Sequence, residues 1–395
     1  MQNLKYKFRL YPNKEQLAAL SQVAGNCRFI WNHFLASEHK TYSDTKKFNF
    51  FNKNSSDLTV LKKELDWLSL APAVALQQTL KNLDLSMKTF FKNKTKRGFP
   101  RFKVKKNFQT SFTLTMVSIQ KNVKDNTFYI PKVGDVRCVY TRALPSDFAS
   151  CQIKQEAGKW FVVLTVKKQV EHIFKTGRQV GIDLNSHSYV LSDGTEIVIP
   201  KYLRDSQAKL RFLQKSLSRK KKGSSNRKKA QFKLSRHHWN VKQKRLDFCH
   251  KLTTSLIRKY DTIFLEDLNV VGIQKFNGHI IKDNIFALFR SQLEYKGLLY
   301  GKTVFCIDRW FPSSKTCNSC GAIKDDLKLS ERLYVCEHCG AVEDRDLNAA
   351  KNILTAGQAG LVCGDHVSRD VKISQLVDEA ENFGSDSGNH RPLGR

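Results

Sequence analysis

Four cysteines in the last third of the sequence have the type and spacing of metal ligands. Cys317 and Cys320 form one CxxC pair, Cys336 and Cys339 form a second, and 15 residues separate the two pairs. This is the four-thiolate spacing of a zinc ribbon, in which two knuckles hold one tetrahedral ion. Four thiolates leave no open position on the metal, so we expect one structural zinc ion that does no hydrolysis. His338 lies inside the second pair and is interpreted as a spectator.

Three carboxylates stand at the ends of predicted elements in the same half of the chain. Asp183 ends the strand in GIDLN, Glu266 ends the strand in TIFLE, and Asp346 begins the helix in DRDLNAAKN. Each alone is more often a turn or helix cap than a ligand. Their order, however, is the one in which an RNase H-like fold gathers carboxylates around two divalent ions. Two such ions ~3.5–4 Å apart can place a water in line with the leaving oxygen of a phosphodiester.

The predicted roles of these carboxylates follow from their positions. Asp183 is the candidate bridging ligand, and Glu266 and Asp346 each complete the shell of one ion, since hard oxygen ligands suit magnesium. Asp267 and Asp344 are the nearest alternatives. On a strand, Asp267 faces away from Glu266. Asp344 precedes the helix by two residues and is expected to cap it or to support its ligand.

Length and charge limit the class of protein. The chain has 395 residues, 41% hydrophobic residues and 8 prolines, which indicates two or three folded domains rather than a disordered or fibrous chain. Its formal charge of +32 favours nucleic acid as the partner. The sequence contains neither a run of ~18 apolar residues nor an apolar N-terminal segment, so neither a membrane span nor secretion is indicated. We therefore expect the protein to stay inside the cell.

The first half of the chain divides into helical and β-rich parts. Residues 3–10 alternate like a strand, and apolar residues recur at helical spacing from Lys14 to about Phe91. We predict three or four helices here, with a polar connection around 43–56 and a helix start at Asp57. Short alternating runs from about 108 to 168 predict a small antiparallel β domain, which the N-terminal strand could join.

The second half combines apolar strands with a strongly basic segment. Residues 201–260 hold 20 Lys and Arg against two Asp, a net charge of +18, and their apolar spacing predicts two long helices joined at Gly223–Asn226. TIFLEDL and KTVFCID predict further strands, with a helix near 285–299 between them. The tail beyond 356 has few large apolar residues and is predicted to be disordered.

These motifs together resemble one known family. GIDLN, FLEDLN, CNSCG, CEHCG and DRDLNAAKN, in this order, resemble the RuvC-like domain of TnpB, an RNA-guided nuclease that insertion-sequence transposons carry and that is related to type V CRISPR effectors. FRLYPNKEQ, CRFIWNHFL, ALQQTLKNLD, GFPRFK and FPSSKTC resemble the same family, so the similarity extends over roughly residues 4–355. By motif position the resemblance carries over the three carboxylates as catalytic and the four cysteines as zinc ligands.

The resemblance implies a multi-domain α+β architecture. Its parts are a helical recognition domain, a small wedge-like β-barrel, a RuvC-like α/β nuclease domain of RNase H type, an inserted zinc ribbon and a disordered tail. In this sequence they correspond to 13–104, to 1–12 with 105–175, to 176–310 with 343–356, to 311–342, and to 357–395. The implied activity is RNA-guided, metal-dependent hydrolysis of double-stranded DNA next to a short duplex motif. The implied partners are target DNA and one transposon-end-derived guide RNA per chain, with two Mg²⁺ ions, or Mn²⁺, as cofactors. The implied location is prokaryotic and cytoplasmic, associated with the nucleoid.

Candidate nucleic-acid contacts lie in three places. Lysines on the basic helices can grip an A-form heteroduplex by its backbone: Lys220, Lys221, Lys222, Lys228 and Lys229. Phe51, Ser55 and Gln77 are candidates for reading the duplex motif, because the amide of Gln77 can bond adenine at two atoms. The alternative interpretation of Gln77 is a polar residue on a helix surface. Phe99, Phe102 and Phe108 either stack on bases or fix a loop.

Two other functions share parts of this pattern. A catalytically silent RNA-guided repressor has the same fold but is expected to lack one or more of the carboxylates, and this chain keeps all three. A transposase joins DNA strands with the same RNase H-like centre but acts on transposon ends without a guide. RNA that co-purifies with the protein distinguishes the nuclease from the transposase.

Overall fold

The computed structural model divides into two compact units, one spanning Asn3–Lys168 and the other following Lys168. It describes 2–92, 98–104, 110–115, 121–122, 126–144, 148, 150–168, 173–185, 187–268, 285–328 and 330–362. Phe108 and the segment from 363 to 395 lie outside the described residues, so the interpretations made for them stay predictions. In the described part of the chain, no helix is long and apolar enough to cross a membrane.

The described part of the first unit contains four helical elements, and local hydrogen bonds define both ends of the first. The four elements are α1 (Lys14–Thr45), α2 (Phe51–Glu64), the 3₁₀ turn η1 (Asp66–Leu70) and α3 (Ala73–Lys92). Asn13 caps α1 in a capping box with Gln16, and Lys46 ends the helix in the left-handed conformation at φ 56°.

The connection between α1 and α2 is shorter than the sequence predicted, and the predicted helix start at Asp57 is wrong. The connection contains only residues 46–50, and α2 begins at Phe51. Asp57 lies inside α2, where its carboxylate pairs with Lys53 at 3.0 Å across one turn. Asp57 therefore stabilises α2 through a salt bridge within the helix and does not cap it.

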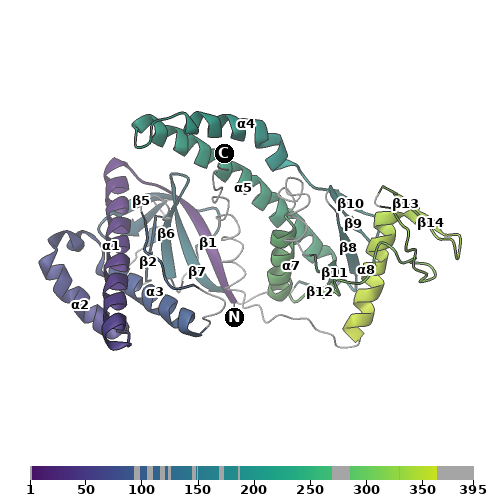
Figure 1. The fold of residues 1–395 in the computed structure, drawn as a ribbon, viewed down its shortest axis with the longest axis horizontal. Coiled ribbons are helices and arrows are strands. Elements are labelled where there is room, and N and C mark those ends of the chain that lie inside the picture. The colour runs from purple at the N-terminus through teal and green to yellow at the C-terminus, as the bar shows by residue number, and fades with distance from the viewer. Residues whose placement is uncertain are drawn as a thin grey trace. The chain divides into compact units, whose positions relative to one another are not determined.

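A seven-stranded sheet completes the first unit (Figure 1). Its strands are β1 (Gln2–Tyr11), β2 (Ser111–Leu114), β3 (Lys121–Asn122), β4 (Thr127–Ile130), β5 (Gly134–Val139), β6 (Ser150–Glu156) and β7 (Lys159–Lys168), in the order β2-β6-β7-β1-β5-β4-β3. The N-terminal strand β1 therefore lies inside the sheet, between β7 and β5. Phe8 and Leu10 of β1 share one hydrophobic core with Leu20 and Leu76 of the helices. The helical and β-rich parts thus pack as one unit.

The second unit is built on a five-stranded mixed sheet. Its strands are β8 (Gln179–Leu184), β9 (Ser188–Leu191), β10 (Glu196–Val198), β11 (Thr262–Glu266) and β12 (Thr303–Ile307), in the order β10-β9-β8-β11-β12. β8, β11 and β12 run parallel, whereas β9 is antiparallel to both β8 and β10. The carboxyl ends of β8 and β11 therefore meet at one edge of the sheet.

Helices cover both faces of this sheet. α5 (Ser225–Lys259) and α7 (Phe286–Tyr300) pack on the face to which Ile182 of β8 and Ile263 of β11 point. α8 (Arg345–Val362) packs on the opposite face, where Phe264 and Ile353 share a separate small core. Because side chains alternate along a strand, every second residue of β8 and β11 faces α8.

The helices α4 (Tyr202–Ser218) and α5 form the basic pair that the sequence predicts (Figure 1). Gly223, at φ 86°, makes the turn between them, and the Ser224 hydroxyl caps α5 by accepting the amide of Arg227. The Arg227 side chain donates back to the carbonyls of Leu217 and Lys220. These contacts fix the tip of the hairpin.

The last described segment is a cysteine-bearing loop pair followed by α8. The strands β13 (Leu333–Val335) and β14 (Val342–Asp344) pair antiparallel beside the cysteines. α8 continues to Val362, so the prediction of a disordered tail from residue 357 is wrong for 357–362, which are helical. The reason is packing: at Gly357 an added Cβ would lie 2.1 Å from the ring of Phe264, so the later turns still cover β11.

Candidate active site and metal centre

Asp183 and Glu266 stand side by side at the carboxyl ends of parallel strands. The register pairs Leu265 with Ile182, which places the next residues of the two strands, Glu266 and Asp183, beside each other. The side chains of Ile182 and Leu265 point to the α5 and α7 face. By alternation, Asp183 and Glu266 both point to the face that α8 covers.

α8 brings Asp346 to the same place. Gly181, two residues before Asp183, lies so close to α8 that an added Cβ would be 2.3 Å from the Ala350 carbonyl oxygen. At the other end of this contact, the Gln358 amide donates to Gln179 at 2.8 Å. The helix therefore runs antiparallel to β8, and one turn before Ala350 is Asp346, on the same side of the helix. Asp346 thus faces Asp183.

Burial dominates the electrostatics of Asp183 and Glu266, and repulsion by the neighbouring carboxylates adds to it at Asp183. Asp183 is 6% exposed and accepts a hydrogen bond from the Asn185 amide at 2.7 Å. Burial, and after it the charges of Glu266 and Asp346, raise the pKa of Asp183 to about 8. Burial also raises the pKa of Glu266, which accepts a hydrogen bond from the Ser313 hydroxyl. At neutral pH Asp183 is therefore largely protonated unless a cation compensates its charge.

Among the described residues, Arg345 and Arg332 pair with Asp346, and the charge of Arg345 also acts on Asp183. The Arg345 guanidinium lies 3.1 Å from one carboxylate oxygen of Asp346, and Arg332 lies 3.9 Å from the other. Asp183 accepts a hydrogen bond from the Asn185 side-chain amide, and Glu266 accepts one from the Ser313 hydroxyl. Carboxylate oxygens are hard ligands of the type that Mg²⁺ and Mn²⁺ bind. The neutral donors on Asp183 and Glu266 leave lone pairs free, so the three residues fit a divalent ion.

The two alternative carboxylates have other partners. Asp267 forms ion pairs with Arg290 of α7 and with Arg309, at 2.5 Å for the latter, and so points away from Glu266. Asp344 caps α8, because its carboxylate accepts the amides of Asp346 and Leu347 at 3.0 Å each. Both positions agree with the predicted structural roles.

The four cysteines form a cluster that could hold one metal ion. Their sulfur atoms all lie within 4.8 Å of one another. Among the described residues, this is the one group of at least three His, Cys, Asp or Glu side chains whose ligand atoms lie that close together. Cys317 and Cys339 are 3.7 Å apart, and Cys320 and Cys336 are 3.6 Å apart. Hydrogen bonds from the backbone amides of Cys339 and His338 lower the pKa of Cys336 to about 6, which favours a thiolate.

Each CxxC pair has the backbone of a metal-binding knuckle. Gly321 and Gly340 follow the pairs with φ of 77° and 74°, a conformation that glycine adopts without strain. Their amides donate to the carbonyls of Cys317 and Cys336, at 2.9 Å in both knuckles. The chain thus turns back symmetrically at both pairs, and four thiolates in this arrangement suit zinc.

Two of the three residues predicted to read a duplex motif share a pocket. Ser55 and Gln77 line a pocket of about 330 Å³ between α2 and α3, together with Lys62 and Lys63. Phe51 does not line this pocket, but the Lys81 ammonium lies 5.2 Å from the centroid of the Phe51 ring in a cation–π contact. Of the aromatic residues that the sequence left open, Phe99 packs against the core of the first unit, and Phe102 is 52% exposed.

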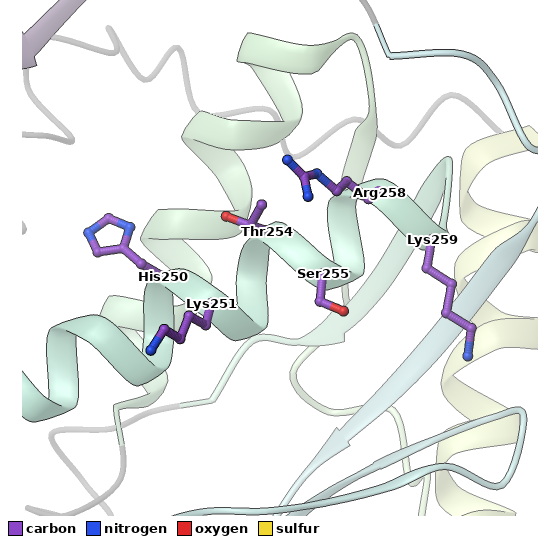
Figure 2. A pocket seen from close by; sticks show the side chains of 6 residues that line it. All are labelled: His250, Lys251, Thr254, Ser255, Arg258 and Lys259. Atoms are coloured by element: carbon purple, nitrogen blue, oxygen red, sulfur yellow. The ribbon is translucent and has the colours of Figure 1, made fainter. Parts of the chain in front are cut away.

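The basic helices present two separate cationic surfaces. All five lysines predicted to contact nucleic acid are exposed at the tip of the α4–α5 hairpin. A second surface, which the sequence pattern did not single out, is a pocket of about 600 Å³ near the C-terminal end of α5, lined by His250, Lys251, Thr254, Ser255, Arg258 and Lys259 (Figure 2). Lys296 of α7 lies beneath it and donates to the Thr254 hydroxyl at 2.8 Å. The pocket residues are adjacent polar pairs that recur at every fourth position, at 250–251, 254–255 and 258–259, and this spacing was the available signal in the sequence.

Comparisons with known proteins identify the family. The family described as "Probable transposase" matches residues 162–277, "Cas12f1-like, TNB domain" matches 286–353, and "Helix-turn-helix domain" matches 1–47. A Streptomyces pristinaespiralis protein, provisionally named RNA-guided DNA endonuclease, is 38% identical over 379 residues, 93% of each chain. An Escherichia coli protein with the same provisional name is 30% identical, over 92% of this chain and 94% of its own. The chain belongs to the TnpB family.

The fold of this TnpB-family protein also resembles a solved structure. A Cas12f1 complex with guide RNA and target DNA matches with a TM-score of 0.56 at 15% identity, covering 86% of this chain and 82% of that one. At that identity the likeness concerns the fold alone. The region matched as helix-turn-helix, 1–47, contains one strand and the single long helix α1 in this protein.

Proposed function

We propose that this protein is an RNA-guided DNA endonuclease that cuts target DNA next to a short duplex motif. The observation that carries the proposal is the meeting of Asp183, Glu266 and Asp346 on one face of the second sheet, in a chain of the TnpB family. The family relatives carry the name of this activity. The electrostatic interaction of Asp183 with both other carboxylates supports a shared metal site.

The three carboxylates would hold the catalytic metal, with Asp183 as the ligand common to two ions and Glu266 and Asp346 each serving one. Bound Mg²⁺, or Mn²⁺ in its place, would supply the activated water and the charge compensation for phosphodiester hydrolysis. Asn185 and Ser313 orient the carboxylates of Asp183 and Glu266 through the hydrogen bonds they donate. Arg345 holds the carboxylate of Asp346 against the first turn of α8. The buried position of Asp183 keeps bulk water from screening these charges.

Zinc is the proposed structural ion of the cysteine cluster. Four thiolates around one tetrahedral ion leave no place for a substrate water, so this ion would not take part in hydrolysis. Its role would be to hold together a segment whose described residues bury little apolar surface: Tyr334 and two of the cysteines. Small cysteine-rich modules of this kind depend on the metal for folding.

The proposed domain roles follow the TnpB family. Residues 13–104 would form the recognition domain, 1–12 with 105–175 the wedge-like domain, 176–310 with 343–356 the RuvC-like nuclease, and 311–342 the zinc ribbon. The order of the five-stranded sheet, three parallel strands flanked by an antiparallel hairpin, supports an RNase H-like nuclease. The common core of the first unit supports recognition and wedge parts that act as one body.

Nucleic acid would be bound mainly through phosphate contacts. The hairpin lysines Lys220–Lys222, Lys228 and Lys229 and the α5 surface of Figure 2 would grip a guide–target heteroduplex by its backbone, which requires no reading of base sequence. The pocket containing Ser55 and Gln77 would read the adjacent duplex motif, because a glutamine amide can bond adenine at two atoms.

One variant and one measurement test the proposal. Asp183→Asn keeps the shape of the side chain but removes its charge, so cleavage of a matched target should be lost while target binding stays within a few-fold of wild type. RNA that co-purifies with the wild-type protein should be a single defined species that directs cutting. Wild-type cleavage by the variant would contradict the metal site. In the wild-type protein, strand joining without RNA would favour the transposase. Guided target binding by the wild-type protein without cutting would favour the repressor.

A further inference from the structure

The segment between β12 and the first CxxC pair connects a proposed catalytic carboxylate to the cysteine cluster. We define it as the Phe311–Cys317 segment. Its Ser313 is 5% exposed, and the Ser313 hydroxyl donates a hydrogen bond to Oε1 of Glu266. Four residues later the same segment ends in Cys317, one of the four clustered cysteines. A single short stretch of chain therefore touches both sites.

Two buried asparagines of α8 hold this segment in place. The side-chain amide of Asn352 donates to the carbonyl oxygens of Ser313 and Thr316, at 2.8 and 2.6 Å. The Asn348 amide donates to the Thr316 carbonyl at 2.8 Å, and its side-chain oxygen accepts the backbone amide of Asn318 at 2.9 Å. Asn318 lies inside the first CxxC knuckle. The two asparagines thus join the Ser313 backbone to the cysteine cluster.

These asparagines share their helix with Asp346. Asn348 and Asn352 are 2% and 4% exposed, so their amides have little access to water and depend on these partners. Asp346 lies in the first turn of the same helix, whose backbone packs closely on Gly181, two residues from Asp183. One rigid helix therefore fixes Asp346 directly and reaches Glu266 through the Phe311–Cys317 segment.

We propose that Ser313 is a positioning residue for Glu266, held by Asn352 and coupled through Asn348 to the metal state of the cysteine cluster. The proposal rests on the metal-binding role of Glu266 in the proposed function. A glutamate carboxylate rotates broadly about its last torsion, and a hydroxyl donor on one oxygen fixes that rotation while lone pairs remain for a metal. Loss of such a support for a metal ligand typically costs ~10–100-fold in metal affinity or activity.

The test measures metal binding without nucleic acid. Purified zinc-loaded protein is titrated with Mn²⁺, and free Mn²⁺ is followed by its electron paramagnetic resonance signal. Ser313→Ala should bind Mn²⁺ about 10-fold more weakly than wild type, with unchanged zinc content. Ser314→Ala is the matched control, because Ser314 is the neighbouring, exposed serine and should leave binding unchanged. Wild-type Mn²⁺ affinity in Ser313→Ala would overturn the positioning role.

Glu266→Gln separates this proposal from the function on which it rests. If Glu266→Gln binds Mn²⁺ like wild type, the metal site of the proposed function is wrong. If Glu266→Gln weakens binding and Ser313→Ala does not, only the positioning role is wrong.

The coupling to the cysteine cluster is tested in the same titration with Cys317→Ser. The zinc-free variant should bind Mn²⁺ several-fold more weakly, because the Phe311–Cys317 segment loses its fixed end. Circular dichroism verifies that the rest of the protein is folded. Unchanged Mn²⁺ affinity in folded, zinc-free Cys317→Ser overturns the coupling, whereas the result for Ser313→Ala stands independently of whether this cysteine variant folds.

Discussion

Replacing Gly181 by alanine should separate α8 from β8 and disable the site without touching a charged residue. The added Cβ would lie 2.3 Å from the Ala350 carbonyl oxygen and 2.5 Å from the Leu354 nitrogen, both backbone atoms that cannot rotate away. Ordinary contact begins at 3.4 Å, so the helix must retreat by about 1 Å. Asp346 moves with the helix.

The expected magnitudes follow from this displacement. Overpacking against an unyielding neighbour costs ~1–3 kcal/mol, which lowers the melting temperature of a unit of this size by roughly 2–12 °C. A shift of ~1 Å in a catalytic group can lower the rate about 100-fold. Single-turnover cleavage of a matched target should therefore fall far more than guided target binding, which should remain within a few-fold of wild type.

Gly25→Ala is the control for this experiment. Gly25 lies inside α1, and the nearest atom to an added Cβ is the end of the Arg28 side chain at 3.8 Å. Alanine should there stabilise the helix by ~0.5–1 kcal/mol and leave cleavage unchanged. A Gly181→Ala protein with the melting temperature and cleavage rate of wild type would refute the close packing of α8 on β8 and the placement of Asp346 derived from it.

Three further predictions concern pH, metals and salt. Because the folded pKa of Asp183 is about 8 and the usual value is ~3.9, the folded metal-free protein holds more protons than the unfolded chain between these values, so its stability should fall as pH rises through that window. Thermal unfolding without Mg²⁺ should show this slope, and Asp183→Asn should flatten it. Mild EDTA should stop cleavage and added Mg²⁺ should restore it, with about one zinc retained, whereas Cys336→Ser should lose zinc, stability and activity; active protein without zinc in elemental analysis contradicts this. Nucleic-acid affinity should fall steeply between ~50 and ~200 mM salt. The slope of affinity against salt should flatten when alanine replaces the five hairpin lysines Lys220, Lys221, Lys222, Lys228 and Lys229. An unchanged slope would mean that these lysines form only a solvated surface.

Local sequence was sufficient to predict the elements that carry the site. The strand end at Glu266 was predicted correctly, and the strand carrying Asp183 ends one residue later than predicted, at Leu184; both strands were predictable because apolar residues precede each carboxylate. The distinction between Glu266 and Asp267 was predictable from strand alternation, and Asp267 pairs with arginines on the other face. The capping role of Asp344 followed from its place two residues before Asp346. In each case the signal lies within a few residues of the feature.

Helix boundaries were predicted less well, because polar residues at a helix start have more than one use. Ser55, Ser56 and Asp57 together have the composition of a cap, yet they lie inside α2, where Asp57 pairs with Lys53. The start of the disordered tail was placed too early, at 357, because small residues around Gly357 gave no apolar pattern. Their small size is what lets the helix approach Phe264.

Contacts between distant parts of the chain could not be predicted from sequence pattern. Ser313 lies 47 residues from Glu266, and no spacing rule relates a serine in a loop to a carboxylate at a strand end. The α5 surface of Figure 2 was missed for another reason: basic residues recur along the whole of 201–260, so the sequence could not single out one stretch. Only the packing of α5 on α7, with Lys296 beneath Thr254, distinguishes it.

The same distinction explains why the two metal centres differ in how far the sequence determines them. The thiolates lie in two short knuckles, each of which fixes its own backbone through a glycine and two local hydrogen bonds, so spacing alone nearly determines the cluster. The carboxylates come from two strands and a helix separated by long insertions, and their approach depends on a glycine at 181 and on two asparagines of α8. Substitutions at these uncharged positions should therefore impair the carboxylate site while all three carboxylates remain in the sequence.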